Sequence, residues 1–206
     1  GAPSYHQTYA IMTFKPSSPI PLKFIIILCC FTAFVSVAPA QNQYFTRNGA
    51  VTFYSSAPLE DIKAVNHNAT AVLDMRTGAI EFSVLMRSFN FKKALMQEHF
   101  NENYVESDRF PKAVFKGKIQ DIENLDFTDP DPHRVSVDGE MTLHGVTRPM
   151  NAEATLDMTD PEMPVGKATF VIRPEDYGIE IPALMRDKIA EEIEVTVEVK
   201  LTSLNR

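Results

Sequence analysis

Four histidines, His67, His99, His133 and His144, are the residues after position 40 best suited to metal binding or acid–base chemistry. No two of them form the HxH or HExxH spacing of a zinc site, and no cysteine follows position 40 to complete one. Glu98 precedes His99, but adjacent residues on a helix point about 100° apart and do not face each other. We therefore predict neither a metal site nor a catalytic pair, and we interpret His99 and His144 as structural hydrogen-bonding residues.

The absence of other enzyme motifs and the acidic charge of the chain exclude further classes of function. The sequence contains no Gly-x-Ser-x-Gly elbow, phosphate-binding loop or dinucleotide fingerprint. The chain has 27 acidic and 20 basic residues, which gives a net charge of −7. Nucleic acids and anionic lipid headgroups both require clustered Lys and Arg. This composition argues against a nucleic-acid partner, and the sequence predicts neither an enzyme nor a bound cofactor.

Residues 1–40 have the pattern of an N-terminal extension followed by a secretory signal peptide. Lys15 and Lys23 precede an uncharged apolar run over 24–37, and the small residues Ala-Pro-Ala end at Ala40. A membrane span needs roughly 20 apolar residues, so an anchor is the weaker alternative. We expect cleavage after Ala40, which would remove both cysteines. The protein would then be periplasmic or secreted, without stable insertion in a membrane.

Residues 41–206 are expected to form one domain built mainly of strands. In the run 193–201 every odd position is apolar and every even position is polar. Alternate side chains of a strand face opposite ways, so this pattern predicts a strand with one buried face. The pattern recurs at 80–84, 135–143 and 152–156, and in shorter form at 51–53, 69–75, 113–119 and 168–172. About eight strands with turn residues between them favour an antiparallel barrel or a sandwich.

Three stretches interrupt this rhythm. Residues 90–104 contain two apolar pairs spaced four apart, which predicts one helix of about three turns with Asn90 as its N-cap. Residues 176–188 include a glycine and a proline, and we interpret them as an irregular segment that covers one end of the barrel. The sequence also allows a shorter helical piece near 59–65. The fold class is therefore all-β with one or two short helices.

Three ordered motifs in this chain resemble those of the YceI-like family. Residues 98–117 contain the pair His99-Phe100, an aromatic residue at Tyr104, and an aromatic-Pro step that leads into a Phe-bearing strand. Residues 137–148 (VDGEMTLHGVTR) are similar to the family's segment around a His-Gly-Val-Thr core, and residues 168–179 match more weakly. The motifs keep the family's order and span most of the chain after position 45.

The resemblance implies an extended eight-stranded antiparallel β-barrel, lipocalin-like in shape, with a helix packed against it. Family members are exported, and some bind long isoprenoid chains along the barrel axis. We therefore expect a protein that binds or carries an apolar small molecule, a lipid or an isoprenoid, in its interior. The alternative is a structural or stress-associated envelope protein with a filled barrel and no ligand. Whether the protein is a monomer or a homodimer is left open.

The interior of such a barrel is the candidate site. Eight strands enclose just enough space to be filled by side chains or to hold one small ligand. Fourteen Phe and nine Met, with no Trp, suit a deformable apolar lining. The candidate ligand-binding residues, taken from the apolar faces of the predicted strands, are Phe82, Val84, Phe115, Val137, Met141, Phe170, Val195 and Val197. In a filled barrel the same residues would form a solid core.

Overall fold

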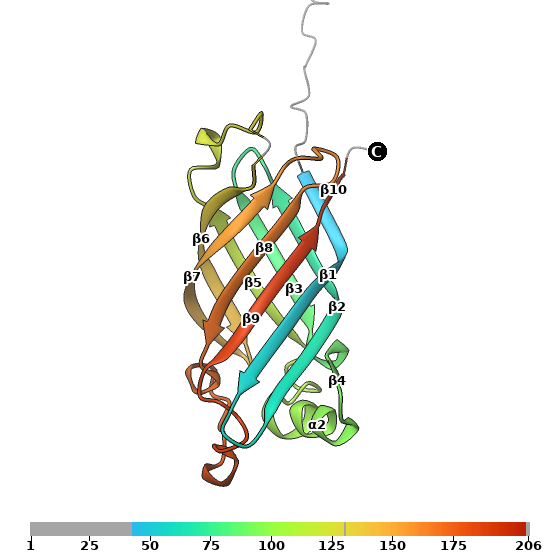
Figure 1. Ribbon diagram of the computed structural model, residues 1–206, viewed down its shortest axis with the longest axis vertical. Helices are drawn as coiled ribbons and strands as arrows, with labels where there is room; N and C mark the ends of the chain where they lie inside the picture. Colours follow the sequence, from blue (N-terminus) through green and yellow to red (C-terminus); the bar gives the residue numbers. More distant parts are fainter. Residues whose placement is uncertain (1–42, 130, 205–206) are drawn as a thin grey trace, which may run out of the picture. The chain divides into compact units, whose positions relative to one another are not determined.

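Ten strands and a few short helical turns make up the described part of the computed structural model, residues 43–129 and 131–204 (Figure 1). The predicted N-terminal extension and signal peptide, residues 1–40, lie outside these ranges. Within them, no helix has both the length and the apolar character needed to cross a membrane.

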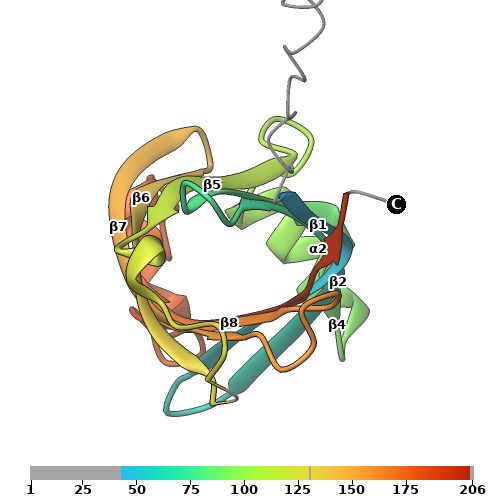
Figure 2. The ribbon, with the colours of Figure 1, turned by 90° about the horizontal axis from the view of Figure 1, so that it is seen from above.

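Eight long strands form a closed antiparallel wall, as predicted. They are β1 (Gln43–Ser56), β2 (Asp61–Asp74), β3 (Ala79–Leu85), β5 (Lys112–Ile119), β6 (His133–Leu143), β7 (Val146–Asp157), β8 (Val165–Ile172) and β9 (Ile193–Lys200), and the short strands are β4 (Asn90–Phe91) and β10 (Thr202–Ser203). They pair in the order β10-β1-β9-β8-β7-β6-β5-β3-β2-β4, and pairing of β1 with β2 closes the barrel (Figure 2). β4 and β10 are two-residue strands attached to this wall.

Strand β1 is much longer than the predicted strand at 51–53, and strand β2 replaces the helical alternative at 59–65. The pairing of β1 with β2 shifts register between Thr46 and Gly49 and again between Gly49 and Val51. Such bulges break the period of two along the strand, so the alternation cannot be followed through them. In β2, a buried polar residue, Asn66, further obscures the pattern.

Asn66 bridges a gap in the hydrogen bonding of β2. Its side-chain Nδ2 donates to the Leu85 carbonyl oxygen at 2.8 Å, and its Oδ1 accepts from the Asn68 backbone N–H at 2.8 Å. On either side of this point β2 pairs with β3 at Thr70–Leu73 and with β4 at Ala64 and Val65. The fully buried amide thus replaces backbone pairs that the bulged strand does not make.

The predicted helix begins later than expected. Asn90 belongs to β4, where its side-chain Nδ2 donates to the Ser88 carbonyl oxygen at 3.2 Å, so it is not an N-cap. Helix α2 spans Ala94–His99 and continues as a π-helical turn over Phe100–Tyr104. The prediction was wrong about the start because the apolar spacing does not distinguish a short strand beside the barrel from a first helical turn.

The irregular segment after β8 covers the lower end of the barrel in Figure 1, as predicted. It contains two 3₁₀ turns, Pro174–Tyr177 and Ala183–Met185. The backbone N–H of Leu59, in the turn between β1 and β2, donates to the Asp187 carbonyl oxygen at 2.8 Å. The buried Ser55 hydroxyl accepts from the Ala190 backbone N–H at 2.9 Å. These two bonds hold the segment against the β1–β2 hairpin.

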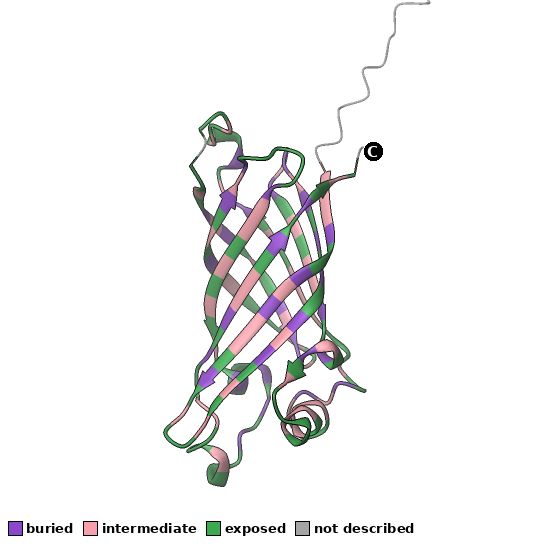
Figure 3. Ribbon diagram, turned by 45° about the vertical axis from the view of Figure 1, so that its right-hand side comes forward, coloured by how far each residue is buried: buried purple, intermediate pink, exposed green. Residues whose placement is uncertain are grey.

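Buried and exposed residues alternate along the strands (Figure 3), and the buried ones form two clusters. The first cluster lies at the lower end, toward α2, and includes Phe89, Met141 and Tyr177. The second lies at the upper end, where the turn at Ile122–Asn124 and the β7–β8 connection meet, and includes Ile122 and Leu156. The space between the two clusters is the interior of the barrel.

Candidate functional site

The barrel encloses a cavity of about 500 Å³ that is lined almost entirely by apolar side chains. Ile193 and Leu201, at opposite ends of the last long strand and its extension, both line it. Eight residue steps along a strand correspond to about 26 Å, or about 20 Å along the axis of a barrel whose strands tilt by 35–45°. The cavity is therefore long as well as large.

All eight residues proposed from the sequence lie on the wall of this cavity. They come from strands β3, β5, β6, β8 and β9, and are Phe82, Val84, Phe115, Val137, Met141, Phe170, Val195 and Val197. The alternation in the sequence thus assigned the correct face to each strand. That these residues contact a ligand stays a prediction.

The upper end of the cavity is closed. Leu73, Leu156 and Leu201 line this end, and each is at most 2% exposed. Behind them, Ile122 and Met158 belong to the same buried cluster but do not line the cavity. This apolar plug makes the cavity a blind tunnel.

The lower end carries a cluster of four aromatic rings, from β1, the segment between β3 and β4, β4 itself, and the π-helical turn after α2. Phe100 stacks on Phe53 with ring centroids 5.4 Å apart, and it contacts Phe91 at 5.0 Å and Phe89 at 5.8 Å. All four rings line the cavity. Aromatic pairs at such distances contribute stability beyond their buried area, so the cluster holds α2 against the barrel.

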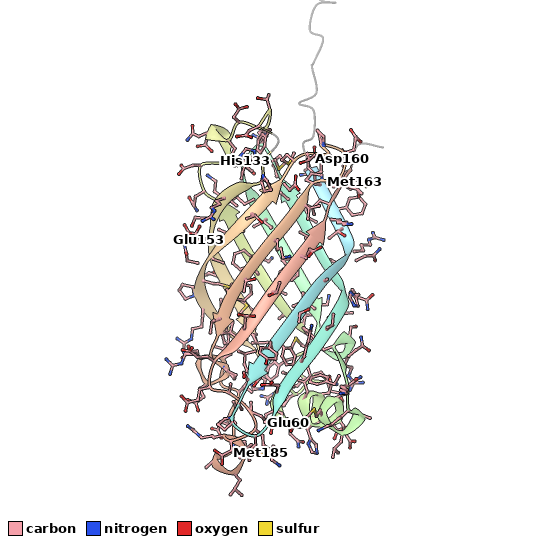
Figure 4. The ribbon with its side chains drawn as sticks, viewed as in Figure 1. Glu60, His133, Glu153, Asp160, Met163 and Met185 are labelled. Atoms are coloured by element: carbon pink, nitrogen blue, oxygen red, sulfur yellow. The ribbon has the colours of Figure 1, made fainter. Side chains whose placement is uncertain are left out.

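The cavity reaches the surface beside α2. Leu95 lines it and is 60% exposed, and Met185 and Lys188 line it from the segment after β8. Lys93, at the start of α2, forms an ion pair with Glu60 of the β1–β2 turn. Figure 4 shows Glu60 and Met185 at this lower end, whereas His133, Asp160 and Met163 lie at the upper end. We call this opening the mouth.

Two glycines let one large ring pack along the wall. Gly117 of β5 and Gly139 of β6 are directly paired. A Cβ at Gly117 would lie 2.5 Å from Cζ of Phe115, and one at Gly139 would lie 2.7 Å from the same atom. The Phe115 ring therefore occupies the space above both glycines, along the wall and not across the barrel.

His144 joins the three sequence motifs at the lower end. It forms a two-residue turn with Gly145 between β6 and β7, and both residues have positive φ (52° and 77°), as the tight hairpin turn requires. Its ring Nδ1 lies 3.2 Å from the Tyr177 carbonyl oxygen, and its Nε2 lies 2.9 Å from Glu106 Oε2. The Phe110 ring packs edge-on against it at 4.5 Å. The prediction that His144 is a structural hydrogen-bonding residue is confirmed.

The other histidines behave differently. His99 lines the cavity and makes no side-chain hydrogen bond to any described residue, so the same prediction was wrong for His99. His67 is exposed on β2, and His133 packs against Phe127 at the upper end. Within residues 43–129 and 131–204, no three His, Cys, Asp or Glu side chains are grouped as metal ligands would be.

Several cavity residues were not predicted from the sequence. They are Phe53, Phe89 and Tyr104, and the isoleucines of the segment after β8, Ile179 and Ile181. Phe53 follows the alternation of the first predicted strand and could have been found by that signal. The others lie in irregular or helical segments, where no periodicity indicates which side chains face the barrel.

Comparisons with known proteins agree with this geometry. The family model for the YceI-like domain matches residues 44–201. The fold is similar to a polyisoprenoid binding domain from Saccharophagus degradans implicated in plant cell wall breakdown, with a TM-score of 0.69 and 12% identity over 79% of this chain and 99% of that one. It is also similar to BcnA of Burkholderia cenocepacia, with a TM-score of 0.62 and 12% identity over 75% of this chain and 96% of that one.

A third solved structure, the YCEI protein of Campylobacter jejuni, is similar with a TM-score of 0.52 and 14% identity, over 66% of this chain and 81% of that one. No curated protein sequence matches the chain. At these identities the structural likeness establishes the fold, and the family model extends over most of the barrel. The chain belongs to the family of YceI-like domains.

Proposed function

We propose that the protein binds one long apolar molecule, a lipid or an isoprenoid, inside its barrel. The blind, apolar cavity of about 500 Å³ carries this proposal. Small-molecule sites span roughly 300–1,000 Å³, whereas a packed core has few voids larger than a water molecule. The filled-barrel alternative leaves a cavity of this size unexplained.

The shape of the cavity favours a chain over a compact ligand. The closed upper end and the open mouth define one axis, along which an extended chain can enter. Each buried methylene contributes about 0.8 kcal/mol, so affinity should rise with chain length until the tunnel is filled. The related domain of Saccharophagus degradans is described as polyisoprenoid binding, which supports an isoprenoid as the first class to test.

A binding role fits the lining better than a catalytic one. General acid–base or nucleophilic catalysis needs polar groups that converge on one reacting atom. The cavity wall is formed instead by aliphatic and aromatic side chains of eight strands, and the polar residues are confined mainly to the mouth. A carrier or sequestering protein is the function that this lining supports.

Native mass spectrometry of protein purified from its own cell envelope tests the proposal. We expect a mass above that of the polypeptide by one lipophilic molecule, which organic solvent should extract. Protein that carries the polypeptide mass alone, and gains none when incubated with lipid extract, would contradict it.

We also propose that the protein acts in the periplasm or outside the cell, on the basis of the signal-like pattern over 12–40. N-terminal sequencing of the native protein should then begin at or near Gln41. Recovery of residues 12–40 intact in a membrane fraction would overturn this part of the proposal.

A further inference from the structure

The π-helical turn after α2 places two polar rings on the cavity wall. The Val105 backbone N–H donates to the Phe100 carbonyl oxygen at 2.9 Å, a bond that spans five residues where an α-helix spans four. His99 and Tyr104 are also five residues apart, and both line the cavity. Single π-helical turns occur frequently at functional sites. Here the turn brings an imidazole and a phenol to the same apolar space.

These two rings have no partner within the described part of the chain. Neither makes a side-chain hydrogen bond to another residue of 43–129 or 131–204. Both residues are half-buried, and their side-chain polar atoms keep some accessible surface. Burial raises the pKa of the Tyr104 hydroxyl, which is consistent with a phenol held away from bulk water.

Two of the neighbouring polar groups at the mouth already have partners. The Ser55 hydroxyl accepts from the Ala190 backbone N–H, and Glu60 pairs with Lys93. A polar group that faces an apolar space loses its hydrogen bonds to water when an apolar ligand fills that space, unless the ligand supplies a replacement. A purely hydrocarbon ligand would therefore leave both rings unsatisfied.

We propose that His99 and Tyr104 hydrogen-bond the polar head of the ligand, an uncharged oxygen group such as a carbonyl or a hydroxyl at one end of an apolar chain. This inference rests on the proposed function and adds the direction of binding. The head lies near α2, and the chain extends toward the closed end at Leu73 and Leu201. A carbonyl or hydroxyl suits this position because an imidazole and a phenol can each donate a hydrogen bond to its oxygen. Glu60 and Lys93 already pair with each other.

The test compares two probes on delipidated protein. One is a long-chain isoprenoid alcohol, geranylgeraniol, and the other is the isoprenoid hydrocarbon of matched carbon number. Tyr104→Phe and His99→Leu should each weaken binding of the alcohol by about fivefold, the equivalent of one hydrogen bond, and leave binding of the hydrocarbon unchanged. Tyr54→Phe, an exposed tyrosine of β1 that does not line the cavity, should change neither.

The outcomes separate this inference from the proposed function. If both probes bind and the variants weaken neither, or weaken both equally, the head-binding role is wrong while the apolar site stands. If neither probe binds wild type, the proposed function fails and this inference fails with it. A second measurement needs no substitution: nitrogen NMR of the histidine rings in wild type detects the contact between His99 and the ligand head. The alcohol must shift the His99 signals more than the hydrocarbon does, and equal shifts would overturn the assignment.

Discussion

The Phe115 ring packs over Gly139 in the wall of the barrel, where a Cβ would lie 2.7 Å from the ring's Cζ atom. The same Cβ would meet the Lys116 carbonyl oxygen of the paired strand. Glycine at this position therefore permits both the close approach of β5 to β6 and the position of the ring along the wall. The barrel stays hollow only if large side chains such as Phe115 lie along its wall and not across its interior.

Substitution of this glycine tests the relationship. Gly139→Ala should lower the free energy of unfolding by about 1–3 kcal/mol, as overpacking does in other cores. The matched control is Gly166→Ala in β8, where the new Cβ would meet only a methyl group of Val199, at 3.1 Å. Urea denaturation measures both. Equal losses would show that the contact with Phe115 and Lys116 is not what requires glycine.

The orientation of β9 can be checked at two adjacent residues. Val197 lines the cavity and Glu198 pairs with Lys167 on the outside at 3.4 Å. Val197→Asp places a carboxylate in an apolar space and should destabilise the fold by several kcal/mol. Glu198→Gln removes one exposed ion pair and should change stability by no more than about 1 kcal/mol. Thermal melts that fall together for the two variants would contradict the register.

These strands also show which features a sequence can predict. β9 was predicted because strict alternation over 193–201 leaves only one face to bury. β1 was underestimated because its bulges near Gly49 break that period, and the start of α2 was misplaced because apolar spacing does not resolve β4 from a helical turn. The strand residues of the cavity wall could be predicted from the local alternation, whereas the residues of the irregular segments could not.

Whether the barrel is hollow could not be predicted either. The volume left inside depends on how rings pack across strands, as Phe115 does over Gly117 and Gly139. It also depends on contacts between segments far apart in sequence, such as the stacking of Phe53 on Phe100. A filled and a hollow barrel share the same alternation, so only the assembled structure distinguishes them.

His144 should stabilise the lower end through its side chain. His144→Asn removes the contacts to Glu106 and to the Tyr177 carbonyl oxygen but tolerates the positive φ of this turn. We expect a loss of about 1–3 kcal/mol, because the carbonyl oxygen of the buried Tyr177 loses its partner and the bond to Glu106 is also lost. His67→Asn, on an exposed part of β2, is the control and should stay within about 0.5 kcal/mol of wild type. Similar denaturation midpoints for both variants would show that His144 does not join these segments.

Acid should lower the stability of the folded protein through Asp157, at the upper end of the barrel. Hydrogen bonds from the Thr159 hydroxyl, at 2.7 Å, and backbone N–H, at 2.9 Å, lower the pKa of Asp157. A carboxyl whose pKa is lowered by folding stabilises the protein above its unfolded pKa, near 3.9, and this contribution is lost as pH falls through the folded pKa. Asp157→Asn should therefore lose less stability than wild type between neutral pH and about pH 3. An identical loss in both proteins would contradict this role.

Melting of the delipidated protein with and without a long-chain isoprenoid quinone tests most directly whether the barrel is a hollow binding site. A ligand that binds only the folded state raises its Tm with increasing concentration. Ala154 and Val84 both line the cavity, so Ala154→Phe and Val84→Phe should fill part of it. Without ligand these variants should melt near the wild type, and with quinone their Tm should rise less. A wild-type Tm that quinone does not move, together with strong destabilisation of both unliganded variants, would instead mean that the barrel is filled.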